Sequence, residues 1–331
     1  MKRITGRWHY WLPGLVISAL AVYLALSQVN GDQLRQSLAT ARYGYLLPCA
    51  ALLMLGLGVR AVRWRGLLGG AITLPDSFAI VGIAYLTNSL MPLRAGEVAR
   101  VYLATRRIPP IPAFTAAGTI VLERLLDALM ILLWLSLTVA AGAPIPGEIR
   151  GAALVGAPVI LMAFLGLVLL AGQRAMATRL LAALNARLPT RFDLLVWGER
   201  FLDGLTPLTQ PRKLLAALLW TALGWVCTAG AGWALMFAFY DRGDVWVASL
   251  FVSALAFAVA LPAVPGNLGT FELAIVTVLT LTRSGEPAGQ AVAFAIILHA
   301  IDLGVYMLAG LFGFFHLGLS PTSILRREKE E

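Results

Sequence analysis

The chain has 331 residues, of which 59% are apolar and 13% are charged, and its mean hydropathy is +0.81. Soluble domains keep about a quarter of their residues charged, so this composition excludes a soluble globule and predicts a polytopic membrane protein. The net charge of +9 comes from Lys and Arg residues near the ends of apolar runs. It therefore indicates membrane sidedness, and no nucleic-acid partner is expected.

The apolar runs predict an all-α fold with about eight spanning helices, because roughly 20 apolar residues cross ~30 Å of hydrocarbon. The expected spans are 11–28, 43–59, 112–141, 151–171, 214–239, 245–263, 266–282 and 290–317. The first is interpreted as a retained signal-anchor, since 25-ALS-27 is a poor cleavage site. Residues 1–331 are treated as a single membrane domain.

Lys and Arg in short loops favour the cytoplasmic side, and most of the 26 fall there if both termini are cytoplasmic. This orientation predicts a multi-pass protein of the bacterial inner membrane. It also requires the short apolar stretch 78–92 to enter from the cytoplasm and return there as a re-entrant hairpin. The arginines of 60-RAVRWR-65, beside Trp64, are interpreted as interfacial anchors.

The connection 172–213 predicts two amphipathic helices on the cytoplasmic face. Leu180, Leu181 and Leu184 share one helical face, and a second apolar series follows Pro189. We expect both helices to lie in the interface with their arginines toward anionic head groups. The alternative is a soluble helical hairpin packed on the membrane domain.

Two parts of the chain repeat the same order of features. The segments 92-PLRAG-96 and 265-PGNLG-269 are each followed by an acid, and then by a helix with a polar centre, 122-LERLLDAL-129 or 298-LHAIDLGV-305. The repeat units are 71–141 and 245–317, and the span count makes them inverted. Inverted repeats with broken helices are typical of alternating-access transporters. Coincidence of short motifs is the alternative.

The chain places ionisable residues inside predicted spans, where each charge costs at least ~2.5–3.5 kcal/mol. They are Glu123, Arg124, Asp127, His299 and Asp302. Arg124 and Asp127, like His299 and Asp302, stand three residues apart and could neutralise each other locally. Each pair is either a structural ion pair or part of a substrate site. His299 with Asp302 could also couple transport to protons, or be a hydrogen-bonded structural pair.

The helix breaks predict an anion site. Pro92 and Gly96 would free backbone N–H groups, and Arg94 and Arg100 would add donors suited to phosphate. Plain positive-inside anchoring is the alternative for these arginines. The second break, with Gly266, Asn267 and Gly269, has no arginine and is expected to form a gate or polar wall.

No arrangement of residues predicts catalysis, a cofactor or a metal site. Cys49 and Cys227 lie in apolar runs and are expected to pack in the core. We therefore predict a protein that is not an enzyme.

The strips NSLMPLRAGEVARVYL, TIVLERLLDAL and LPAVPGNLGTFELA together resemble the flippase-like membrane region of the lysylphosphatidylglycerol synthase family and its stand-alone relatives. The resemblance covers about residues 10–318 and implies movement of a lipid between leaflets. The residues that match its pattern are Asn88, Pro92, Arg94, Gly96, Glu97, Arg100, Glu123, Arg124, Asp127, Pro265, Gly266, Gly269 and Glu272.

Bifunctional family members carry an aminoacyl-transferase domain after the membrane region, whereas this sequence stops at 326-RREKEE-331. We therefore do not expect lysyl-lipid as the product or cargo. The expected partner is an anionic phospholipid, a polyprenyl-phosphate-linked lipid or a hopanoid. A lipid head-group transferase and a non-transporting scaffold of a lipid-synthesis complex are the alternatives, and association with itself or with lipid-biosynthesis enzymes is left open.

Overall fold

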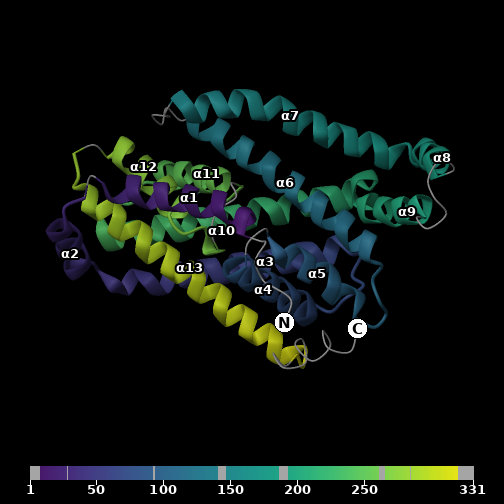
Figure 1. The fold of residues 1–331 in the computed structure, drawn as a ribbon, viewed down its shortest axis with the longest axis horizontal. Helices are drawn as coiled ribbons and strands as arrows, with labels where there is room; N and C mark the ends of the chain where they lie inside the picture. Colours follow the sequence, from purple (N-terminus) through teal and green to yellow (C-terminus); the bar gives the residue numbers. More distant parts are fainter. Residues whose placement is uncertain are drawn as a thin grey trace.

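The computed structural model describes residues 8–27, 29–91, 94–140, 147–185, 193–260, 265–283 and 285–319. Within these ranges the chain forms helices joined by turns, without a β-strand, which agrees with the predicted all-α class (Figure 1). Of the predicted site residues, Pro92 lies outside the described residues. The α-helices are α1 Trp8–Leu26, α2 Gly31–Thr40, α3 Leu46–Leu67, α4 Leu74–Leu90, α5 Ala95–Thr105, α6 Ala113–Ala140, α7 Gly147–Gly172, α8 Arg174–Asn185, α9 Leu194–Leu205, α10 Pro211–Phe239, α11 Val245–Ala260, α12 Thr270–Thr282 and α13 Ala288–His316. Three short 3-10 turns complete them, η1 Tyr43–Tyr45, η2 Thr206–Thr209 and η3 Pro265–Asn267.

Two series of four helices follow the same order of lengths. In the first, α3 and α6, of 22 and 28 residues, enclose the shorter α4 and α5, of 17 and 11 residues. In the second, α10 and α13, of 29 residues each, enclose α11 and α12, of 16 and 13 residues. At 1.5 Å per residue, α11 and α12 are only about 24 and 20 Å long, so neither alone crosses ~30 Å of hydrocarbon.

The packing of the two series is also matched. Helix α3 lies along α10, while α4 packs on α13 and α11 packs on α6. The contacts within each series correspond as well, because α4 meets α5 as α11 meets α12, and α5 meets α6 as α12 meets α13. Close approach of α4 and α13 depends on glycine, since a side chain at Gly82 or Gly313 would run into the backbone of Ala309 or Ala79.

Three described helical segments are long and apolar enough to cross a membrane, Tyr43–Leu67, Pro211–Phe239 and Ala288–His316. A fourth candidate is Pro158–Gly172 with Arg174–Asn185, two segments that meet at a bend of 91°. Helix α6 is long enough but carries three charged residues in its middle. The protein is therefore a membrane protein with three to four clear spans by these criteria, and the count of about eight stays a prediction.

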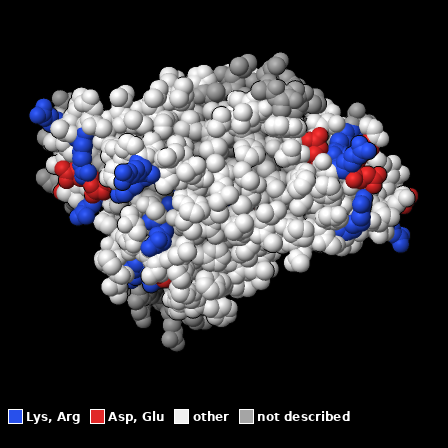
Figure 2. Space-filling view, turned by 180° about the vertical axis from the view of Figure 1, so that it is seen from behind, with Lys and Arg blue, Asp and Glu red and all other residues white. Residues whose placement is uncertain are grey.

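On the face shown in Figure 2, charged side chains gather toward the two ends, with an uncharged band between them. Helices α8 and α9 lie at one end of the long axis, and α2 lies at the other (Figure 1). We call these the α9 end and the α2 end. Helix α2 was not expected; its N-terminus is capped by the Asn30 side chain, which accepts a hydrogen bond from the Asp32 N–H.

Helices α8 and α9 lie where the sequence predicts two amphipathic helices, at 172–213. Leu202, Gly204 and Leu205 of α9 are buried, and Gly204 lies against the backbone of α6 at Thr115. Helix α9 thus packs on the membrane-spanning part, whereas most of α8 is exposed. Cys49 and Cys227 are both buried free thiols, which confirms that they are core residues.

Candidate functional site

The first helix break lies between α4 and α5. Helix α4 ends at Leu90 with Met91 as its C-cap, and Arg94 adopts a left-handed conformation with φ 53° as the N-cap of α5. The Gly96 N–H donates a hydrogen bond of 2.8 Å to the Asn88 side-chain oxygen. A side chain at Gly96 would meet the Ala84 carbonyl, so only glycine allows α5 to fold back this closely on α4.

The second break lies between α11 and α12 and is built from glycines with positive φ. Gly266 has φ 74°, Asn267 has φ 54° and Gly269 has φ 87°. The Gly269 N–H donates to the Glu272 carboxylate at 2.7 Å, which caps α12. Gly266 lies beside the Ser89 carbonyl at the end of α4, so the two breaks are in contact.

These bonds change one part of the predicted anion site. The N–H groups of Gly96 and Gly269 donate to side chains of the chain itself, and the Glu97 N–H donates to the Arg94 carbonyl. These three N–H groups are therefore already hydrogen bonded within the protein. The prediction that the breaks leave free backbone N–H groups is wrong for them.

A buried network of charges joins α3, α5 and α6 next to the first break. Arg63 is 2% exposed and forms ion pairs with Glu123 at 3.2 Å and Asp127 at 2.6 Å. It also donates to the Thr221 hydroxyl at 3.0 Å. The interpretation of Arg63 as an interfacial anchor is wrong, because its guanidinium neutralises two acids of α6 instead of meeting the interface.

Arg100 is the second buried cation of this network. It is 2% exposed, forms an ion pair with Glu123 at 2.7 Å and lies over the Trp64 ring at 4.3 Å. The Trp64 indole N–H in turn donates to the Thr119 hydroxyl at 3.2 Å. Arg100 of α5 thus pairs with Glu123 of α6 and packs on Trp64 of α3. Its side chain is enclosed by the protein.

Arg124 differs from Arg63 and Arg100 because it is loosely paired and accessible. Its side chain is 38% exposed, and its nearest acids are Asp127 at 3.5 Å and Glu97 at 3.9 Å. The predicted local pair of Arg124 with Asp127 is present, but Asp127 is bound more closely by Arg63. Three arginines and three acids balance the network, and Arg124 is the member with the weakest contacts.

The second unit has one compact pair at the equivalent place. His299 of α13 contacts Glu272 of α12 at 2.6 Å and stacks on Phe271 at 4.1 Å. Glu97 and Arg124, like Glu272 and His299, are 27 residues apart in the sequence. The local pairing of His299 with Asp302 is not observed, since His299 faces Glu272 and Asp302 hydrogen bonds to Tyr306.

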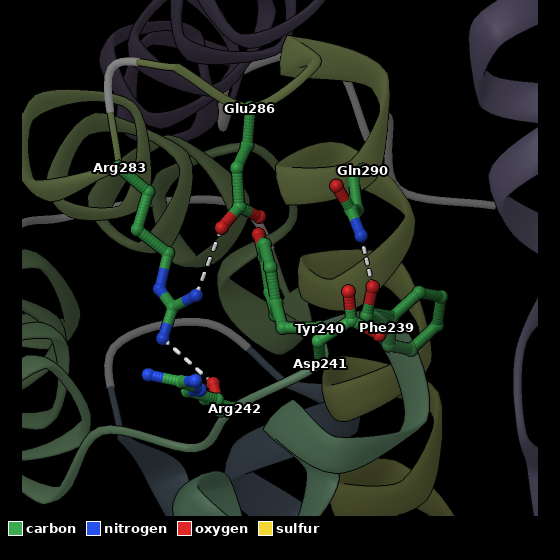
Figure 3. A pocket seen from close by; sticks show the side chains of 7 residues that line it. All are labelled: Phe239, Tyr240, Asp241, Arg242, Arg283, Glu286 and Gln290. Atoms are coloured by element: carbon green, nitrogen blue, oxygen red, sulfur yellow. Dashed lines mark hydrogen bonds and ion pairs between the residues drawn. The ribbon is translucent and has the colours of Figure 1, made fainter.

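Two adjoining polar hollows open at the α2 end, far along α3 from the charged network. One of about 410 Å³ lies between the 239–242 turn and the 283–290 segment, and a second of about 320 Å³ continues beside α2. In Figure 3 Arg283 points between Glu286 and the Arg242 carbonyl, at 3.0 and 2.8 Å. Burial, with Glu286 nearby, raises the pKa of the Tyr240 phenol, over which Arg283 lies.

The structure brings together most residues predicted from the first motif. Asn88, Gly96, Glu97, Arg100, Glu123, Arg124 and Asp127 surround the first break, and Gly266, Asn267, Gly269 and Glu272 form the second. Arg63, Trp64 and Thr221 were missed as members of the network. Arg63 stands at the end of an apolar run. At such a position the sequence pattern of a buried arginine is the same as that of an arginine that anchors the helix at the interface.

Comparison with known proteins identifies the family. The sequence profile described as "Lysylphosphatidylglycerol synthase TM region" matches residues 11–310. The chain belongs to this family. It is also 23% identical over 352 aligned positions to a protein of Haloferax volcanii named "Glycosyltransferase AglD". The alignment covers 96% of this chain but 56% of the relative, so the chain spans about half of that protein's length. No solved structure matched the chain.

Proposed function

We propose that this protein moves an anionic phospholipid or a polyprenyl-phosphate-linked lipid between the leaflets of the bacterial inner membrane, with both termini in the cytoplasm. The observation that carries the proposal is Arg124, a partly exposed arginine inside a membrane helix whose two acidic partners are at 3.5 and 3.9 Å. Arginine binds phosphate through paired N–H groups, and an intramembrane cation with weak internal partners favours such a ligand. Arg94, exposed at the N-cap of α5, is the second proposed contact.

The buried ion pairs next to Arg124 support this site. Arg63 and Arg100 bind Glu123 and Asp127 at 2.6 to 3.2 Å, so these four side chains neutralise one another in the core. A phosphate that approaches Arg124 competes with Glu97 and Asp127 at longer distances and does not need to break the short pairs. We assign Arg63 and Arg100 to positioning and Arg124 to head-group binding.

A route between leaflets is supported by the matched helix series. The two breaks touch each other, and each lies between two short helices. Helix α4 begins where Asp76 contacts His316 at the end of α13, whereas α12 ends where Arg283 donates to the Arg242 carbonyl. We propose that the series α3–α6 and α10–α13 are inverted repeats with re-entrant hairpins, and that rocking of one against the other alternates access. The polar hollows at the α2 end, with Arg42, Arg242 and Arg283 around them, offer a head-group site on the far side.

The proposal is tested by lipid movement in liposomes that contain the purified protein. A fluorescent phosphatidylglycerol is placed in one leaflet, and its appearance in the other is followed by chemical quenching. We expect movement above that of empty liposomes, and about a tenfold slower rate for Arg124→Ala, because a charge-assisted contact is worth about 1.5–3 kcal/mol. The control Arg174→Ala removes a partly exposed arginine that pairs with Asp203 at the α9 end. No movement by the wild-type protein, or equal rates for both variants, contradicts the proposal.

A head-group transferase is the second candidate, favoured by the name of the Haloferax volcanii relative. It predicts a covalent product when the protein is incubated with a lipid acceptor and an activated sugar, detected by mass spectrometry of the lipids. Such a product from purified protein would favour the enzyme, and movement of unmodified lipid without a product would favour transport.

A further inference from the structure

A second arginine of α3, Arg60, has a surrounding that the proposed function does not use. It lies seven positions before the helix end at Leu67, so about 10 Å of helix separates it from that end. Its guanidinium lies beside Gly56, one turn earlier, because a side chain at Gly56 would approach Arg60 Nη1 to 3.3 Å. The charge therefore points toward the middle of the membrane helix and away from the interface, unlike an anchoring arginine.

Arg60 is not balanced by an acid. Across the described parts of the chain, no carboxylate lies within 4.0 Å of its guanidinium, whereas Arg63, one turn further on, has two such partners. Its hydrogen bond goes to the Thr228 hydroxyl of α10 at 3.1 Å. A guanidinium has five N–H donors, so most of them are left for a ligand.

Aromatic rings of three other helices surround Arg60. Its guanidinium carbon lies 5.9 Å from the Tyr85 ring of α4 and 6.0 Å from the Trp225 ring of α10. Tyr306 of α13 contacts Tyr85 with ring centroids 5.0 Å apart. Cation–π contacts at these distances offset part of the cost of a membrane charge, but they do not supply its counter-ion.

The groups around Arg60 are partly exposed and do not form a closed core. Arg60, Tyr85, Trp225, Thr228 and Tyr306 all keep part of their surface accessible, in contrast with Arg63 and Arg100, which are 2% exposed. The nearest acid on α13 is Asp302, which hydrogen bonds to Tyr306 and acts on Arg60 only through space. Arg60 and its neighbours are therefore less tightly enclosed by the protein than Arg63 and Arg100.

We propose that Arg60, with Thr228, Tyr85 and Trp225, forms a binding site for the phosphate of a lipid, one helical turn deeper than the network around Arg63. The Arg60 guanidinium binds the phosphate oxygens, and the amphipathic rings contact the glycerol or first isoprenoid carbons. The Thr228 hydroxyl, which donates to the Gly224 carbonyl, accepts from Arg60 and positions the guanidinium. Because the ligand class follows from the proposed lipid function, this inference rests on that function.

The experiment measures binding in detergent, apart from transport. All proteins carry Arg124→Gln, so that the Arg124 site does not contribute. Binding of short-chain phosphatidylglycerol, short-chain phosphatidylcholine and inorganic phosphate is followed by native mass spectrometry. We expect phosphatidylglycerol to bind best, and we expect Arg60→Gln to weaken its binding at least tenfold. Arg60→Lys should keep part of the affinity, because lysine retains the positive charge but lacks the paired N–H groups of the guanidinium. Arg65→Gln, whose side chain bonds to the Ile72 carbonyl at 3.0 Å, is the control and should bind normally.

Three outcomes overturn the inference. The first is equal phosphatidylglycerol binding by Arg60→Gln, and the second is equal binding by Arg60→Lys if the glutamine variant does not fold. The third is binding of inorganic phosphate as tight as that of the lipid, which would assign the site to a free anion. Binding that depends on Arg60 in a protein that moves no lipid would contradict the proposed transport and leave this site standing.

Discussion

The two helix breaks share the spacing of an acid and a basic residue, but they differ in chemistry. In each, an acid just after the break meets a basic residue 27 positions later, Glu97 with Arg124 and Glu272 with His299. The first contact is long, at 3.9 Å, and belongs to a network of six charges. The second is short, at 2.6 Å, and Glu272 also caps the backbone of α12.

Under the proposed function, this difference distinguishes a break that binds the head group from a break that acts as a gate. Both carboxylate oxygens of Glu272, the acid of the second break, form bonds within the protein, one with the Gly269 N–H and one with His299. Glu272 therefore fixes the turn and holds His299. The acid of the first break has weak partners and stands beside an accessible arginine. We therefore propose a head-group site at the first break and a gate or a proton-coupling pair at the second.

The largest expected effect comes from removing the cation that supports the first region. Arg63→Ala removes the closest partner of Asp127 and leaves Glu123 with Arg100 alone, and breaking a buried pair costs about 3–5 kcal/mol. We expect a correspondingly lower free energy of unfolding, measured by chemical denaturation in detergent. Arg65→Ala is the matched control and should change it by less than about 1 kcal/mol, since its bond to Ile72 is at a helix end. Equal stability of the two variants would show that the network does not support the fold.

Glycine substitutions at the two breaks should have a smaller effect on stability, and they should differ from each other. Gly96→Ala places a side chain against the Ala84 carbonyl and should cost about 1–3 kcal/mol by overpacking α4 and α5. Gly266→Asn introduces a residue that tolerates positive φ, and its Cβ would make only ordinary contacts. It should therefore lower the free energy of unfolding by less than Gly96→Ala does. Thermal unfolding in detergent orders the two variants, and the reverse order would contradict this account of the breaks.

The smallest expected effect concerns pH and tests the second region. We propose that His299, facing Glu272 of α12 and near Asp302 on its own helix, couples transport to protons. The rate of lipid movement by wild-type protein should then depend on pH, and His299→Gln should remove that dependence. His316→Gln, which loses only a contact with Asp76 at the other end of α13, is the control. A pH profile that His299→Gln leaves unchanged would make the pair structural.

The sequence predicts the class and the neighbourhood of the site better than the pairing within it. Apolar runs and the order of the motifs place Gly96, Glu97, Arg124 and Asp127 around one break, because these features are local. The partners of Arg63 and His299 depend on how α3, α6, α12 and α13 pack, which one sequence does not specify. For this reason Arg63 was interpreted as an anchor and His299 was paired with Asp302.

The same limit applies to backbone donors and to short helices. A glycine pattern indicates a helix break, but the acceptors Asn88 and Glu272 that use its N–H groups are set by the fold of the turn. Likewise, 245–263 and 266–282 each have enough apolar residues to suggest a span, while the structure ends α11 at Ala260 and begins α12 at Thr270. Hydropathy alone does not register the positive φ angles that separate them.

The measurement that tests the central claim most directly compares Glu97→Gln with Arg124→Gln in the liposome assay, as the mole fraction of phosphatidylglycerol is varied. Glu97 competes with the phosphate for Arg124, so Glu97→Gln should lower the half-saturating mole fraction, by about two- to fivefold for a weak pair. Arg124→Gln removes the phosphate contact and should raise it by about tenfold or more. Shifts in opposite directions are the predicted result. Shifts in the same direction, or none, would contradict a head-group site at Arg124.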